Sequence, residues 1–191
     1  GTSGIRYWRW PYWDKESLYF LSSTQIGESN TIKTRVYEDK YKNGLDMYSD
    51  GQYATLTGPT SEYTDRTRGA ALEWVNTSLD NHELHFALHY KEDQHRDPKS
   101  SGTEHYKDVT TSLAFEDRIA LGELWQLRVG ASHERRKAKE AHNFETGDTD
   151  ATNGLLELGY DWSQAMQVYG SVAYKTRFPT IKDRYSSRMG Y

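Results

Sequence analysis

The stretch "HELHFALHY" (82–90) fits two kinds of secondary structure, and the two lead to different folds. On a helix, His85 and His89 would share one face at the spacing found in zinc-binding helices. Read with a period of two, every second residue from Leu84 to Tyr90 is apolar, and the residues between them are polar or small. This alternation predicts a β-strand with one apolar face. On a strand the two histidines are about 13 Å apart, too far for one metal ion.

Seven other segments show the same alternation, so the sequence predicts eight strands. We expect them at residues 16–27, 30–42, 65–77, 82–94, 105–118, 122–136, 154–163 and 166–178. The connections alternate in length, with short ones at 27–30, 78–81, 119–122 and 163–165, and long polar ones at 43–64, 95–104, 137–153 and after residue 178. A soluble sandwich would mix short and long connections at both ends. Short turns at one end and long loops at the other are typical of an outer-membrane β-barrel.

The predicted fold class is therefore all-β, an antiparallel up-and-down transmembrane β-barrel, with residues 1–191 belonging to one barrel domain. The composition agrees with an ordered fold, since aromatic residues make up 14% of the chain and disordered segments are poor in them. The net charge is −4, and no long basic run is present to follow a phosphate backbone, so we expect no nucleic-acid partner. Cysteine is absent, which excludes disulfides and thiolate ligands.

The apolar faces of the predicted strands carry aromatic residues at two levels. Tryptophans lie close to the short turns, and tyrosines follow about nine residues further along, which is about the length of strand that crosses a membrane. The opposite faces carry small or charged residues, as a water-filled lumen requires. Outer-membrane lipid is thus an expected partner, and the bacterial outer membrane the expected location. The predicted girdle residues are Trp74, Tyr90, Trp125, Tyr160, Trp162 and Tyr174.

An aromatic cluster near the start of the chain is the main candidate for ligand recognition. Its rings could stack on a catecholate, a corrin or a sugar, and two nearby arginines could pair with an anionic chelate. Packing of the loops and of the upper girdle remains the alternative explanation. Two histidines on or near the long loops could meet an incoming metal complex. The candidate ligand-binding residues are Arg6, Tyr7, Arg9, Trp10, Tyr12, Trp13, His105 and His142.

Signs of catalysis are lacking. The sequence contains no Gly-x-Ser-x-Gly motif, no phosphate-binding loop and no carboxylate pair with a catalytic spacing. The segment "GDTDATNG" (147–154) lacks the glycine and the glutamate that a calcium-binding loop needs at its sixth and twelfth positions. We therefore expect neither an enzyme, nor a cofactor, nor a metal site.

Three segments resemble the middle of the barrel of TonB-dependent outer-membrane receptors. They are "WRWPYWDKESLYF" (8–20), "NTIKTRVYEDKYKN" (30–43) and "VAYKTRFPTIKDRYSSRMG" (172–190), and the last is the most specific, with an aromatic–Pro–Thr triplet followed by "KDRYS". The resemblance implies about eight strands of a 22-stranded barrel. It also implies uptake of a scarce nutrient, most often a ferric siderophore or another metal chelate. Energy would come from the TonB complex through a plug domain, but no plug, TonB box or closing strand is recognisable in this sequence.

Two alternatives remain open at this point. One is a free-standing eight-stranded outer-membrane barrel with a structural or adhesive role. The other is a soluble, aromatic-rich β-sheet protein that binds carbohydrate.

Overall fold

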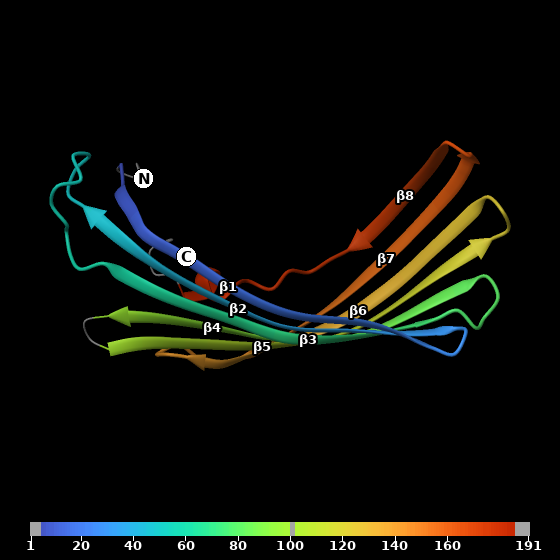
Figure 1. Ribbon diagram of the computed structural model, residues 1–191, viewed down its shortest axis with the longest axis horizontal. Coiled ribbons are helices and arrows are strands. Elements are labelled where there is room, and N and C mark those ends of the chain that lie inside the picture. The colour runs from blue at the N-terminus through green and yellow to red at the C-terminus, as the bar shows by residue number, and fades with distance from the viewer. Residues whose placement is uncertain (1–4, 100–101, 186–191) are drawn as a thin grey trace.

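The computed structural model describes residues 5–99 and 102–185, which form one antiparallel sheet of eight strands arranged in chain order (Figure 1). The strands are β1 (Tyr7–Ile26), β2 (Asn30–Tyr48), β3 (Ser61–Asn76), β4 (His82–Lys99), β5 (Gly102–Leu121), β6 (Trp125–Ala141), β7 (Asp148–Ser163) and β8 (Met166–Tyr174). One short helix follows, α1 (Ile181–Tyr185). Within the described ranges, no helix has the length and apolar character needed to cross a membrane. The all-β, up-and-down prediction is confirmed.

The strands are longer than predicted at the end opposite the short turns. β1 begins at Tyr7 instead of residue 16, and β4 and β5 remain paired as far as Lys99 and Gly102, so 95–104 is not a long loop. Charged residues made these ends look like loops, but cross-strand ion pairs form there within the sheet, as between Lys137 on β6 and Asp148 on β7 at 3.8 Å. The connections that remain between strands at this end include residues 49–60 and 142–147.

Two further predicted boundaries were wrong. The turn predicted at 119–122 lies at 122–124, where Gly122 adopts a positive φ of 74°. β8 ends at Tyr174 rather than at residue 178, because the chain leaves the ladder there and the backbone N–H of Thr176 donates to the Asn153 side chain. Residues 186–190 of the most specific resemblance segment lie outside the described part of the chain.

The sheet is open and curved. In the described residues β1 pairs only with β2 and β8 only with β7, so the two outer strands do not close a barrel. Figure 1 shows the sheet bent into a trough, with the segment after β8 running back over the concave side. That segment reaches β5, where the ring of Tyr185 stacks on Tyr106 with a centroid distance of 4.8 Å. Tyr106 therefore points to the concave side, and alternation assigns the remaining residues to the two faces.

The two faces differ in chemistry, and within ranges 5–99 and 102–185 no second layer of sheet covers either of them. The convex face exposes apolar side chains, among them Leu88 (55% exposed), Leu113 (56%) and Val172 (76%). The concave face carries polar and charged residues. Buried apolar residues are few in the described ranges, namely Leu45, Tyr106, Ala138, Ala141 and Ala151. The described residues thus form a single-layered wall.

The hairpins are staggered along the wall. One unbroken row of directly paired residues crosses all eight strands: Thr24, Ile32, Trp74, Phe86, Phe115, Ala131, Gly154 and Tyr174. From this row to the end of β1 is two residues (Thr24 to Ile26), and to the end of β7 is nine (Gly154 to Ser163). The turns therefore recede by seven residues over the six strand spacings between β1 and β7. At about 3.4 Å per residue and about 4.8 Å per strand, this offset corresponds to a tilt of about 40° between the strands and the normal to the line of turns.

Candidate ligand-binding face

A β-bulge in β1 divides the aromatic cluster between the two faces of the sheet. Arg9 pairs with Asp46 and Tyr12 with Gly44, so two residues of β1 stand opposite the single residue Leu45 of β2. Pro11 lies in the bulge, where its missing N–H does not interrupt the ladder. The extra residue reverses the alternation of the residues that precede it. The cluster predicted as one site is therefore two.

The first part is a string of rings on the concave face, defined here as the tryptophan string Trp8, Trp10, Trp13 and Tyr41. Successive ring centroids are 6.2, 6.1 and 5.5 Å apart, and the interplanar angles of 54–79° make the string a zigzag. Trp13 is 62% exposed, and the guanidinium of Arg6 lies 4.9 Å from the ring centre of Trp8. Exposed rings with a cation at one end can bind a flat or anionic ligand.

The second part packs the 49–60 connection on the convex side. Tyr7 and Tyr48 both contact Tyr53, with centroid distances of 6.2 and 5.4 Å, and Arg9 lies 4.2 Å from the centre of the Tyr53 ring. Tyr12 shares this face and donates a hydrogen bond of 2.7 Å to Glu62. The contacts of Tyr7 and Arg9 anchor the 49–60 connection, and the hydrogen bond of Tyr12 joins β1 to β3, so the packing explanation fits these three residues better than ligand binding does.

The two candidate histidines are not near the tryptophans. His105 lies in β5, within the predicted strand 105–118, and its carbonyl accepts a 3.2 Å hydrogen bond from the backbone N–H of His142. His142 begins the 142–147 connection with a φ of 49°. β1 and β5 are four strand spacings apart, about 19 Å along the sheet. The structure therefore does not bring the two groups of candidates together.

The predicted girdle residues do lie at two levels of the convex face. Trp74 stacks on Phe86 at 5.4 Å and Trp125 contacts Tyr160 at 4.5 Å, and these tryptophans lie within two residues of the end of β3 and at the start of β6. Tyr160 and Trp162 lie three residues and one residue from the end of β7. Tyr90 and Tyr174 each lie eight residues from the start of their strands, β4 and β8. Exposed leucines, valines and phenylalanines fill the space between the two levels.

Beyond Tyr90, further from the short turns, the convex face changes from apolar to charged. The carboxylate of Glu92, with a side chain only 7% exposed, accepts hydrogen bonds from Arg68 at 2.8 Å and from Gln94 at 2.7 Å, and pairs with Lys107 at 2.8 Å. Burial alone would raise the pKa of Glu92, but the bonds from Lys107, Arg68 and Gln94 outweigh it and lower this pKa to about 2. The residue two positions from Tyr90 is thus firmly ionised.

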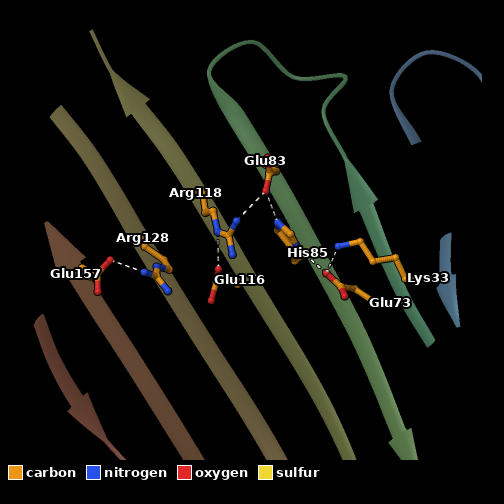
Figure 2. A network of polar contacts seen from close by, with 8 residues as sticks. All are labelled: Lys33, Glu73, Glu83, His85, Glu116, Arg118, Arg128 and Glu157. Atoms are coloured by element: carbon orange, nitrogen blue, oxygen red, sulfur yellow. Dashed lines mark hydrogen bonds and ion pairs between the residues drawn. The ribbon is translucent and has the colours of Figure 1, made fainter. Parts of the chain in front are cut away.

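The concave face carries a ladder of alternating charges near the short turns, which Figure 2 shows crossing neighbouring strands. His85 is its centre, with Nδ1 2.8 Å from Glu73 and Nε2 2.6 Å from Glu83. The ladder continues on both sides of His85 to Lys33 on β2 and Arg118 on β5, and a separate ion pair joins β6 to β7. These pairs are Lys33 with Glu73 (3.4 Å), Arg118 with Glu83 (3.1 Å) and with Glu116 (2.8 Å), and Arg128 with Glu157 (2.5 Å).

The alternation correctly predicted that Glu73, Glu116, Arg128 and Glu157 share the polar face, but not their pairing, which depends on register. The wall beside the ladder has a shallow hollow of about 330 Å³ with a floor of small residues, including Ala87, Ala114, Gly130 and Ser132. Among the described residues, no three or more histidine or carboxylate side chains are arranged so that they could hold a metal ion. No protein-family model, no curated protein and no solved structure matches the chain.

Proposed function

We propose that this chain is part of the β-barrel wall of a TonB-dependent outer-membrane receptor, which takes up a scarce nutrient, most often a ferric siderophore or another metal chelate. One observation carries the proposal. The convex face exposes a band of apolar side chains between two levels of aromatic residues, on strands whose stagger corresponds to a tilt of about 40°. Transmembrane barrels have strands tilted by about 35–45° and an apolar band between aromatic girdles.

The exposed band is difficult to explain in water. Soluble monomers rarely expose contiguous apolar patches of more than a few hundred Å². Leu88 and Leu113 are direct cross-strand partners, and Phe86 and Phe115 continue the apolar surface beside them. In lipid the same side chains would lie in their preferred solvent, and the charged residues beyond Tyr90 would lie at the headgroups.

The unpaired edges of β1 and β8 favour a larger barrel over a closed eight-stranded one. Backbone groups facing lipid must be hydrogen-bonded, because no water is present to replace the missing partners. A free-standing eight-stranded barrel would pair β1 with β8, and the described residues show no such pairing. Strands outside this sheet would supply the partners.

In the proposed receptor the concave face lines the lumen. The tryptophan string lies at the end of β1 next to the 49–60 connection, away from the short turns, which is the extracellular end in a barrel of this kind. A ligand entering from outside would meet these rings and Arg6 first. The protein would bind and pass on its ligand without covalent chemistry, and the TonB complex would act through a plug domain.

The test is the mass and behaviour of the native polypeptide extracted from membranes. We expect it to need detergent, to migrate differently with and without boiling, and to have a mass well above the 22.2 kDa of this chain. A 22.2 kDa polypeptide that stays soluble without detergent would contradict the proposal. The sheet would then have to act in water, and carbohydrate binding by the exposed rings would become the better explanation.

A further inference from the structure

The segment that follows β8 covers a part of the concave face that includes neither the tryptophan string nor the charge ladder. From Lys175 to Tyr185 it crosses the trough toward β5 (Figure 1). The ring of Tyr185 fits between Tyr106 and Phe144, at centroid distances of 4.8 and 5.1 Å. This covering segment encloses the side chains beneath it, which come from β5, β6 and β7.

Two arginines and one aspartate meet under the covering segment. Asp108 on β5 contacts Arg184 of α1, and its Oδ2 is 3.7 Å from Nη1 of Arg136 on β6. The exposed fraction of the side chain is 6% for Asp108, 9% for Arg136 and 14% for Arg184. Among the described residues, Asp108 is the one carboxylate that forms an ion pair with either arginine. The group therefore has an excess positive charge in a largely dry place.

The charge excess has a measurable consequence for Arg136. Burial, followed by the neighbouring charge of Arg184, lowers the pKa of the Arg136 guanidinium, and Asp108 only partly offsets this effect. One Arg136 nitrogen, Nη2, donates to the Thr149 hydroxyl at 2.9 Å. A second anion would relieve the repulsion between the two guanidinium groups.

The hydrogen-bonding capacity of the group is also incomplete. Three buried donors have no hydrogen-bond partner in the described part of the chain, namely Nε and Nη1 of Arg136 and Nε of Arg184, and the 3.7 Å contact of this Nη1 with Asp108 is too long for a hydrogen bond. One buried acceptor, Oδ1 of Asp108, also lacks a partner. Buried polar atoms left unpaired cost free energy, so such a set calls for a bound group. A ligand that satisfied these atoms would have several acceptor oxygens, a negative charge and one O–H donor.

We propose that Arg136, Arg184 and Asp108 form a binding site for a phosphate group. A hydrogen phosphate ion or a singly protonated phosphate monoester supplies acceptors for both guanidinium groups and one O–H for Oδ1 of Asp108. Sulfate has the same shape but no proton at neutral pH, so its oxygens would face the Asp108 carboxylate unfavourably. The site needs only the sheet and the covering segment, so it does not depend on the sheet lying in a membrane.

The test is calorimetric titration of the native protein, purified in detergent only if it needs detergent, with inorganic phosphate, glycerol phosphate and sulfate. We expect phosphate or its monoester to bind at least about tenfold more tightly than sulfate, because only they satisfy Asp108. Tight binding of glycerol phosphate would identify a phosphorylated ligand, and tight binding of inorganic phosphate alone would identify the free ion. If neither binds, or if sulfate binds equally well, the site holds only water and the proposal is overturned.

Variants separate a binding site from a structural ion pair. Arg136→Gln and Arg184→Gln should each weaken phosphate binding by about tenfold or more. The matched control is Arg135→Gln. Arg135 directly precedes Arg136, faces the convex side and pairs with Asp148 at 2.6 Å. Asp108→Asn should admit sulfate and abolish the preference for phosphate. Equal effects of the Arg135 and Arg136 changes would overturn the proposal.

Folding of each variant is checked by far-ultraviolet circular dichroism, in which the β-sheet signal should match that of wild type. Arg184 lies beyond β8, so the Arg184→Gln variant keeps the pairing of the sheet and remains informative if Arg136→Gln does not fold. Detergent dependence of the wild-type chain tests the membrane proposal separately. A chain that needs detergent but binds no phosphate would overturn this site alone.

Discussion

Tyr37 on β2 reaches across β3 to His89 on β4, with its hydroxyl 3.1 Å from the Nε2 atom of the imidazole. The two rings are stacked at a centroid distance of 6.2 Å, and Tyr19 on β1 stacks on the other side of Tyr37 at 6.1 Å. The residue of β3 that pairs directly with Tyr37 is Gly69. The absence of a side chain at this position lets the tyrosine lie across the strand. Three rings in a line thus connect β1, β2 and β4 on the concave face and pass over β3.

Replacement of Gly69 should break this line. A Cβ atom there would lie 2.6 Å from Cζ and Oη of Tyr37 and 2.6 Å from the backbone oxygen of Tyr90, which cannot move aside. We expect Gly69→Ala to lower the free energy of unfolding by about 1–3 kcal/mol, measured by urea titration in detergent. Gly170→Ala on β8 is the control, because nothing lies within 4 Å of its added Cβ. Equal losses in the two variants would show that the ring line is not responsible.

Glu92 should make stability depend on pH in the acid range. Its pKa is about 2 in the folded chain, against a usual value of 4.5. The unfolded chain therefore binds this proton more readily, so the stabilisation is complete above a pH of about 4.5 and is lost as the pH falls through about 2. The contribution at neutral pH is up to about 3 kcal/mol. The difference in unfolding free energy between wild type and Glu92→Gln should shrink over this range.

The control for this measurement is Glu16→Gln on β1, a mostly exposed glutamate 4.0 Å from Lys40. An exposed pair of this kind contributes little. If the difference between wild type and Glu92→Gln stays constant down to pH 2, the ion pairs of Glu92 do not stabilise the fold as proposed.

A lysine at position 113 distinguishes lipid from water around the convex face. Leu113 is 56% exposed and lies in the middle of the apolar band. In a bilayer Leu113→Lys should cost about 2–4 kcal/mol, measured by unfolding in lipid vesicles. In water the same change would cost little, because the lysine would be solvated. Ser112→Lys, one residue earlier and on the concave face, should be tolerated in either case, so an equal cost at both positions would contradict the assignment of the faces.

The two parts of the aromatic cluster should respond differently to truncation. Tyr7→Ala removes a ring that packs against Tyr53, so we expect chymotrypsin to cut the 49–60 connection severalfold faster than in wild type. Trp13→Ala removes an exposed ring of the tryptophan string and should leave the cleavage rate unchanged. Faster cleavage in both variants would mean that the string also packs the connection.

The number of strands, their order and their two faces could be predicted from the sequence because period-two alternation records them directly. From Leu84 to Tyr90 the pattern is unbroken, and the histidines fall on the polar side as expected. The bulge in β1 could not be predicted in the same way, because it is a property of the pairing with β2. Pro11 was the only local signal, because proline inside a strand is confined to edges and bulges, but it does not show which residues change face.

The sites that sequence reasoning missed depend on contacts between distant residues. Tyr106, Asp108 and Arg136 looked like ordinary residues of charged strand ends, and only the covering segment brings Arg184 to them. The extended strand ends were missed for a related reason. The composition of those ends resembles that of a loop, and ion pairs such as that of Lys137 with Asp148 follow only from the register of the strands.

The stagger of the hairpins, taken as an average over the sheet, allows each hairpin to be treated as a repeating unit. Strand tilt depends on the offset per strand, which is about one residue here, and the number of strands does not enter it. Another hairpin with the same offset would widen a closed wall without re-tilting the strands already present. Duplication of such a unit would thus enlarge the enclosed lumen at constant strand tilt. The existing rings and charges would keep their positions along their strands.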